Sequence, residues 1–125
     1  MVGRFAFEDS LSACGYSDGI VRIFNINTDN KICEINTNTA PNDAKPVNSI
    51  RWRPANEDLG SISSVILVAN TDGHVYQYVA KTGKKIFENF EEGNFTMALD
   101  YSPDGKRFCT GGKDNIVRIY DEETK

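Results

Sequence analysis

The chain has 125 residues and a mass of 13.9 kDa, which suits a single domain. Its residues are 39% hydrophobic and 26% charged, a balance typical of a folded soluble protein and too apolar for a disordered tail. The net charge is −4, so the chain lacks the basic field that holds a phosphate backbone, and we expect no direct nucleic-acid partner. No apolar run approaches the roughly 18 residues of a bilayer span, so we expect no membrane partner either.

The sequence shows none of the usual features of a targeting signal. Residues 1–10 lack the long apolar core of a signal peptide. The cysteines, Cys14, Cys33 and Cys109, are an odd number with no C-x-x-C pair, which favours free thiols in a reducing compartment. We therefore expect a cytoplasmic or nuclear protein, and we interpret the glycosylation-like Asn-Phe-Thr tripeptide at 94–96 as a coincidence.

Three units of the chain repeat one pattern, an acidic turn followed by an apolar strand. The units span residues 3–36, 46–91 and 94–125. In chain order the turn and strand are DGIVRIF from Asp18, DGHVYQY from Asp72 and DNIVRIY from Asp114. A valine follows each aspartate by three residues and an aromatic residue follows it by six: Val21 and Phe24, Val75 and Tyr78, Val117 and Tyr120. Agreement at fixed offsets predicts three copies of one structural unit.

Each copy is predicted to form antiparallel strands joined by turns. Apolar residues two apart mark a first strand before each aspartate, at 5–7, 50–52 and 99–101. Asp-Gly at 18–19 and 72–73 suits a tight hairpin because glycine takes positive φ without steric cost, and Asn115 is the next-best residue there. The runs IVRIF and IVRIY are apolar almost throughout, which predicts strands covered on both faces, as in stacked sheets.

The copies differ in loop length. The aspartates are 54 residues apart between the first two copies (72 − 18) and 42 apart between the last two (114 − 72). The extra residues fall in two polar, turn-rich segments, 36–45 and 55–64, which we interpret as surface loops that add binding specificity.

A period near 42 residues with four strands per unit matches the blades of a β-propeller. The stretch YSPDGKRFCTGGKDNIVRIYD, residues 101–121, resembles the signature of the WD-repeat (Trp–Asp repeat) family, with Tyr-Asp at its end where the family has Trp-Asp. GYSDGIVRIFN and NTDGHVYQYV are more diverged copies. The resemblance implies an all-β fold of antiparallel four-stranded blades, about three of them, in an incomplete ring.

The copies depart from the family in two ways. The tryptophan is replaced by Phe24, Tyr78 and Tyr120, and the Gly-His pair before the first strand is missing. In the family that histidine, the turn aspartate and the tryptophan form a buried network with a serine or threonine, and here only the aspartate is kept in all copies. We expect Asp18, Asp72 and Asp114 to hold their turns by accepting nearby backbone N–H groups.

About three blades are too few to close a ring, because propellers have about four to eight. Such a wedge leaves blade faces and a strand edge uncovered. We therefore expect a segment of a longer propeller, in which the remaining blades or a second copy of the chain cover these surfaces.

The sequence gives little support for a catalytic, metal-binding or cofactor-binding site. His74 is the only histidine, and we interpret it as a surface or packing residue, so we expect no enzyme activity. Segments 82–85 and 111–113 lack the spacing of a phosphate loop. The cysteines and His74 fall at different repeat positions, so we expect neither a metal site nor a cofactor. Arg22 and Arg118 share an offset, and we interpret them as structural residues that pair locally.

The resemblance also implies where partners dock. In the family they commonly bind the face formed by the residue before the turn aspartate and by the start of the first strand. By register these positions are Ser17, Thr71 and Lys113, followed by Pro46, Asn48, Phe95 and Met97.

We therefore expect a non-catalytic scaffold that binds other proteins or peptides and assembles a multiprotein complex. Two alternatives stay open. One is a propeller hydrolase of the glycosidase type, which needs carboxylates that converge on the central channel. The other is a structural subunit of a large cytoskeletal or RNA-processing assembly.

Overall fold

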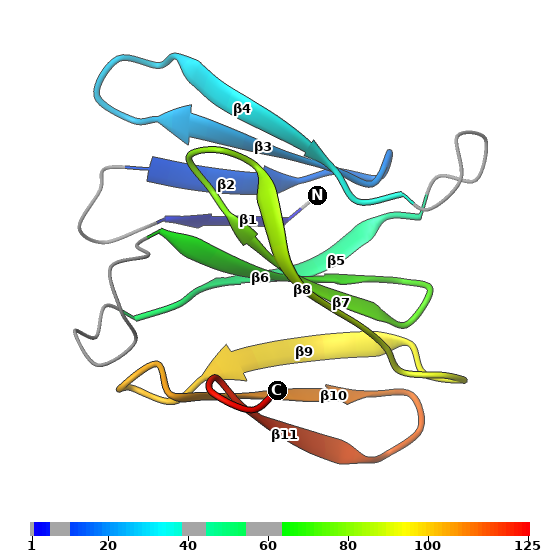
Figure 1. Ribbon diagram of the computed structural model, residues 1–125. Helices are drawn as coiled ribbons and strands as arrows, with labels where there is room; N and C mark the ends of the chain where they lie inside the picture. Colours follow the sequence, from blue (N-terminus) through cyan, green and yellow to red (C-terminus); the bar gives the residue numbers. More distant parts are fainter. Residues whose placement is uncertain (1, 6–10, 39–44, 55–63) are drawn as a thin grey trace.

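The structure, a computed structural model, describes residues 2–5, 11–38, 45–54 and 64–125 (Figure 1). Most of the two loops predicted to add specificity, at 39–44 and 55–63, lies outside the described residues. Eleven strands form the described part of the chain: β1 (Val2–Phe5), β2 (Leu11–Gly15), β3 (Ile20–Asn25), β4 (Lys31–Asn36), β5 (Val47–Trp52), β6 (Val65–Asn70), β7 (His74–Val79), β8 (Lys84–Phe90), β9 (Thr96–Tyr101), β10 (Arg107–Gly112) and β11 (Val117–Asp121). Within these ranges there is no helix of the length and apolarity that a membrane crossing requires.

The strands form three antiparallel sheets, each a meander in which chain neighbours pair. The first sheet has the order β1-β2-β3-β4, the second β5-β6-β7-β8, and the third β9-β10-β11. Figure 1 shows the sheets stacked face to face, with the second sheet between the other two. This arrangement confirms the predicted all-β fold of stacked antiparallel sheets.

The turns between the second and third strands have the predicted backbone conformation. Gly19 and Gly73 have φ angles of 79° and 93°, and Asn115 takes the same role with a φ of 62°. Because this left-handed region is open to glycine and tolerated by asparagine, the Asp-Gly and Asp-Asn pairs fix the turns locally.

The third and fourth strands pair in the same register in the first two sheets. Arg22 lies opposite Glu34, and Tyr76 lies opposite Glu88. In both pairs the register shifts at the same offset, which leaves Ile32 and Ile86 as the extra residues of a bulge. The repeat seen in the sequence is therefore also a repeat of strand register.

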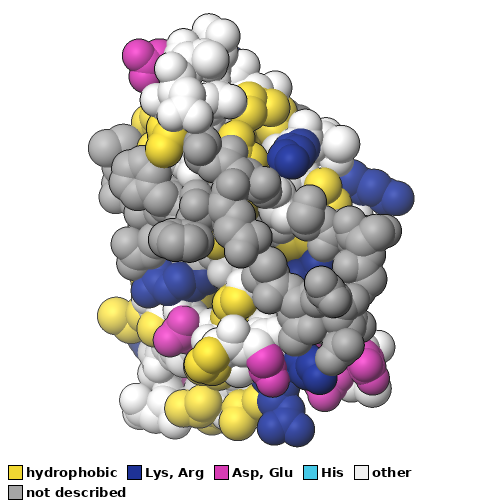
Figure 2. All heavy atoms as spheres, turned by 90° about the vertical axis from the view of Figure 1, so that its left-hand side faces the viewer, with side chains coloured by type: hydrophobic (Ala, Val, Ile, Leu, Met, Phe, Trp, Pro, Cys, Tyr) yellow, Lys and Arg dark blue, Asp and Glu magenta, His cyan; other side chains and the backbone are white. Residues whose placement is uncertain are grey.

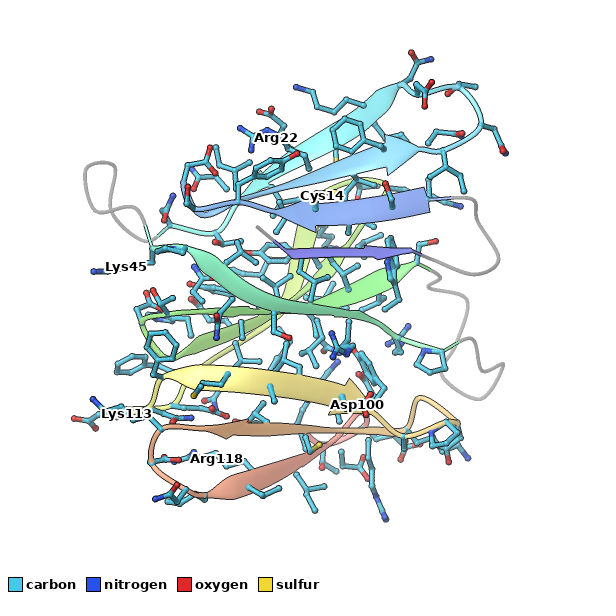
Figure 3. All side chains as sticks on the ribbon, turned by 180° about the vertical axis from the view of Figure 1, so that it is seen from behind. Cys14, Arg22, Lys45, Asp100, Lys113 and Arg118 are labelled. Atoms are coloured by element: carbon cyan, nitrogen blue, oxygen red, sulfur yellow. The ribbon has the colours of Figure 1, made fainter. Side chains whose placement is uncertain are left out.

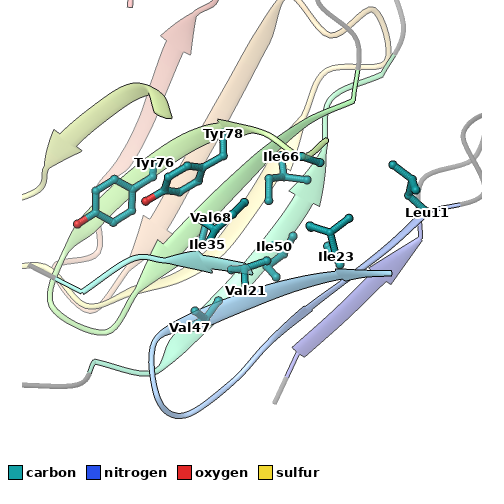
Figure 4. Packing of buried hydrophobic residues seen from close by; sticks show 12 residues of the cluster. Leu11, Val21, Ile23, Ile35, Val47, Ile50, Ile66, Val68, Tyr76 and Tyr78 are labelled. Carbon is teal, nitrogen blue, oxygen red and sulfur yellow. The ribbon is translucent and has the colours of Figure 1, made fainter. Parts of the chain in front are cut away.

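Two hydrophobic cores lie between the sheets. Between the first and second sheets, Val21 and Ile23 pack against Ile50, Ile66 and their neighbours, all fully buried (Figure 4). Between the second and third sheets the core contains Leu67, Ala69, Val75, Leu99 and Phe108. The middle sheet is therefore covered on both faces, and every residue of β6 is buried.

Strand β11 corrects part of the sequence prediction. Its apolar run was expected to be covered on both faces, but Val117 and Ile119 are 70% and 72% exposed. They alternate with Arg118 and Tyr120, which point to the second sheet and are half-buried. The strand has the composition of a covered element, and among the described residues only one of its faces is covered.

Candidate partner-binding face

The predicted binding positions lie on one edge of the stack. The turns at 16–19, 70–73 and 112–115 lie there, together with the segments that lead into β5 and β9, and we call this edge the turn face. It is the right-hand side of Figure 1. Figure 3, seen from behind, shows Lys45 and Lys113 on this edge and Asp100 toward the opposite one.

Each turn aspartate accepts a backbone hydrogen bond from the residue two positions later. Asp18 Oδ1 accepts from the Ile20 amide at 3.0 Å, Asp72 Oδ1 from His74 at 3.0 Å, and Asp114 Oδ1 from Ile116 at 3.1 Å. This bond closes the turn with a side chain, so it holds the loop even where the backbone is exposed. All three turn aspartates make this bond.

The two repeated arginines pair with these aspartates. Arg22 Nη2 lies 3.1 Å from Asp18 Oδ2, and Arg118 Nη2 lies 2.8 Å from Asp114 Oδ2. The hydrogen bond from the arginine lowers the pKa of Asp18 and of Asp114, so both carboxylates stay ionised near neutral pH. The local pairing predicted for these arginines is confirmed.

Backbone hydrogen bonds connect the segments that follow the fourth strands to the turns. The Thr37 amide donates to the Gly19 carbonyl at 3.0 Å, and the Glu91 amide donates to the Gly73 carbonyl at 2.8 Å. Both donors stand 19 residues after the turn aspartate (37 − 18 and 91 − 72). The backbone of the turn face is therefore cross-linked between consecutive elements.

Glu91 is the centre of a buried network behind the turn face. Its Oε1 accepts from Asn94 Nδ2 and Thr96 Oγ1, both at 3.0 Å. Its Oε2 accepts from Thr110 Oγ1 and from the Tyr120 hydroxyl, both at 2.6 Å. One carboxylate therefore ties β9, β10 and β11 to the loop at 91–95.

The environment keeps this carboxylate charged. Burial of Glu91, whose side chain is fully covered, acts to raise its pKa, but the four hydrogen bonds outweigh burial and hold the pKa below its usual range. Arg118 Nη1, 4.0 Å from Glu91 Oε1, adds a positive charge on the same side. The network therefore holds the 91–95 loop with charge-assisted bonds, which are the stronger kind.

A second buried cluster of polar side chains joins the second and third sheets away from the turn face. Arg53 Nη1 lies 3.1 Å from Glu122 Oε2, and both side chains are almost fully buried. Gln77 donates to Glu122 Oε1 and to the Tyr101 hydroxyl. Lys125 Nζ completes the cluster at 2.9 Å from Glu122 Oε2. The two clusters fix the third sheet against the second at both ends.

Comparisons with known proteins identify one repeat of the chain and its fold. Residues 87–121 match the family model described as "WD domain, G-beta repeat". Over 109 residues the chain is 28% identical to the anaphase-promoting complex subunit cdh1 of Dictyostelium discoideum, a match that covers 87% of this chain and 13% of that protein. A chain in the crystal structure of a mitotic checkpoint complex superposes with a TM-score of 0.80 at 18% identity, covering 98% of this chain and 33% of that one. One repeat of the chain, residues 87–121, is therefore a WD repeat, and the whole chain has the fold of that crystal structure.

The three sheets are blades of a β-propeller, and together they form part of a ring. The matched repeat, 87–121, begins on β8 of the second blade and ends with β11 of the third. All four groups that donate hydrogen bonds to the Glu91 carboxylate fall inside it. The buried polar network of this repeat is therefore centred on a glutamate.

Sequence reasoning missed Glu91 because no motif singles out one glutamate of a Glu-Glu pair. A signal did exist, since the polar residues Thr37 and Glu91 share the offset of 19 from their turn aspartates. The sequence does not show that Thr110 on β10 contacts Glu91, because the two residues meet only once the sheet has formed.

The propeller fold brings all seven predicted partner-binding residues to the turn face. Those with exposed side chains are Ser17, Pro46, Phe95, Met97 and Lys113, and Met97 has the largest exposed fraction given among them, 63%. Thr71 and Asn48 are half-buried. Asn48 Nδ2 donates to the Thr96 carbonyl, so this side chain links the first strands of the second and third blades. A binding role for the seven residues stays a prediction.

The cysteines and His74 lie on different strands of the fold. Cys14, Cys33 and Cys109 are free thiols on β2, β4 and β10, and His74 lies on β7. The His74 ring stacks on Tyr76 with centroids 5.5 Å apart and lies 4.7 Å from Phe90, as expected of a packing residue.

Proposed function

We propose that the chain is a non-catalytic scaffold that uses its turn face to bind protein partners and to assemble a multiprotein complex. The observation that carries this proposal is the combination of fixed backbone and exposed side chains on one edge. Phe95 and Met97 flank Thr96, which the buried Glu91 holds in place. Preorganised loops lose little conformational entropy on docking, which favours affinity.

The inner strands support a binding role over hydrolysis. β1, β5 and β9, the strands that lie next to each other along the inner edge, contain one acidic residue between them, Asp100. A glycosidase needs a pair of carboxylates. The two relatives are named for multiprotein assemblies, an anaphase-promoting complex and a mitotic checkpoint complex, which agrees with an assembly role. We place this role in the cytoplasm or nucleus, in keeping with the free thiols.

The turn-face proposal is tested by site-specific photo-crosslinking in cells. A photoreactive amino acid is placed at Met97 on the turn face or, as the matched control, at Lys84, which is exposed at the start of β8 on the opposite edge. We expect a defined crosslinked protein from the Met97 site alone. We also expect Lys113→Glu, but not Lys84→Glu, to reduce that product several-fold. Equal crosslinking from both edges would contradict the proposal.

A further inference from the structure

The connection between the second and third blades, residues 90–95, presents two aromatic side chains on the turn face, and we call it the bridge segment. Phe90 ends β8 and is 51% exposed, and Phe95 precedes β9 and is 37% exposed. Between them Glu91 is buried, whereas Glu92 is exposed. The buried residue fastens the segment to the blades, so the outward side chains are presented from a fixed backbone.

Asn94 connects the bridge segment to the turns of both blades. A Cβ atom at Gly73, in the turn of the second blade, would lie 3.0 Å from the Asn94 carbonyl oxygen. In the turn of the third blade, the Asp114 amide donates to Asn94 Oδ1 at 3.3 Å. The next amide donor of that turn, Lys113, bonds to the Phe95 carbonyl at 3.1 Å. The segment therefore spans the distance between two turns and forms one continuous surface with them.

The two aromatic residues are a feature of this junction and not of the repeat. Phe90 belongs to the middle blade, and its equivalent in the first blade is the polar Asn36, since each lies opposite the residue two after a turn aspartate. Pro46 is the equivalent of Phe95, since the carbonyl of each accepts the amide that precedes a turn aspartate. Pro46 is exposed with a described blade on either side, so this position faces solvent within the propeller. Neighbouring aromatic side chains at such exposed positions are typical of an interaction site.

Charged side chains of opposite sign lie on the two sides of the bridge segment. Glu92 follows the residue whose amide donates to the Gly73 carbonyl, so it lies beside the turn of the second blade. Lys113 lies in the turn of the third blade, at the turn-face edge in Figure 3. Both are exposed, and neither forms an ion pair with another described residue, whereas Asp114 nearby is paired with Arg118 at 2.8 Å. A docking segment therefore meets an anion on one side and a cation on the other.

We propose that the bridge segment binds an extended segment of a partner protein through an apolar residue that docks on Phe90 and Phe95. An acidic residue of the partner pairs with Lys113, and a basic residue on the other side of the apolar one pairs with Glu92. The charges fix the direction of the bound segment, because the reversed segment places like charges together. A Cβ atom at Gly93 would have no described atom within 4 Å, so the tip of the bridge segment is open to a partner. The inference rests on the proposed function, since it names the chemistry of a partner of the turn face.

The probe is a phage-displayed library of random nine-residue peptides, selected on the unaltered chain. We expect the enriched peptides to share an apolar residue between an acidic and a basic residue, in one order only. A synthetic peptide of the enriched sequence should bind Phe95→Ser at least tenfold more weakly, as measured by fluorescence anisotropy. The matched control is Ile26→Ser on the opposite edge, where Figure 2 shows hydrophobic side chains among charged ones and Ile26 is 45% exposed. This control should change binding by less than twofold, and near-UV circular dichroism checks that both variants fold.

Charge reversal tests the pairing directly. A second peptide, with lysine in place of its acidic residue, should bind the unaltered chain at least tenfold more weakly than the parent peptide and should bind Lys113→Glu better than the parent does. Lys84→Glu on the opposite edge should leave the preference unchanged. Equal binding of the two peptides to the unaltered chain would overturn the inference, whether or not the variants fold. A library that yields no binder, or binders without the charge pattern, would also overturn it.

Crosslinking from Met97 separates this inference from the proposed function. We expect the parent peptide, expressed in the same cells, to reduce the crosslinked product several-fold, and the charge-reversed peptide to leave it unchanged. If the product forms from Met97 alone and neither peptide reduces it, the inference fails while the turn face still binds a partner. Equal crosslinking from Met97 and Lys84 would overturn both.

Discussion

Replacement of Glu91 by glutamine should destabilise the third blade, whereas the same change at its neighbour Glu92 should not. The Glu91 carboxylate is buried and accepts four hydrogen bonds, but Glu92 is exposed. Glutamine keeps one acceptor oxygen but has an amide nitrogen in place of the other. This nitrogen is a donor, so it cannot accept the hydrogen bonds that the second carboxylate oxygen accepted. Since a hydrogen bond to a charged group contributes about 1.5–3 kcal/mol, the loss of two gives about 3–6 kcal/mol, and rotation of the Thr110 hydroxyl offsets part of it.

We therefore expect the free energy of unfolding to fall by about 3 kcal/mol for Glu91→Gln and by less than about 0.5 kcal/mol for Glu92→Gln. Urea titration followed by near-UV circular dichroism measures both values, because the aromatic rings of Phe108 and Tyr120 stack in the affected core. A loss below about 1 kcal/mol for Glu91→Gln would refute the argument that this carboxylate holds the network.

The difference in the free energy of unfolding between the parent chain and Glu91→Gln should decrease in acid. The folded pKa of Glu91 lies below its ordinary value of 4.5, so the ionised carboxylate favours the folded state. Its contribution is complete above that value and is lost as the pH falls through the lower folded pKa. The gap between the parent chain and Glu91→Gln should therefore be constant near neutral pH and shrink in acid. A gap that stays unchanged in acid would show that the charge is not its cause.

Two further predictions concern packing and buried charge. Gly73→Ala should lower the melting temperature more than Gly93→Ala: both have positive φ, but a Cβ at Gly73 lies 2.7 Å from the Glu91 carbonyl oxygen and one at Gly93 meets no atom within 4 Å. We expect losses of more than 2 kcal/mol and of about 1 kcal/mol, and equal melting temperatures would contradict this. Arg53→Met should cost about 3 kcal/mol by leaving Glu122 buried without its main partner, and the double variant with Glu122→Leu should recover at least half. Simple additivity in that double-mutant cycle would exclude the coupling.

The sequence alone determined the repeat, the turns and the fold class. These features depend on short-range chemistry: an aspartate bonds the amide two residues later, and a glycine or asparagine permits positive φ. Such interactions are complete within four residues, so their spacing in Asp18-Gly19 or Asp114-Asn115 is sufficient to predict them. The position of Ser17, Thr71 and Lys113 on one edge followed from the same register.

Only the tertiary structure decided which polar residues meet. Thr110 and Tyr120 reach Glu91 from 19 and 29 residues away, and Arg53 pairs with Glu122 across 69 residues. No local pattern encodes such pairs, because their separation in the chain is set by loop lengths and by sheet stacking. The exposure of Val117 and Ile119 is likewise invisible in the run IVRIY, which matches the buried IVRIF of the first blade almost residue for residue. Whether a strand is covered depends on its neighbours, and the neighbours are chosen by the fold.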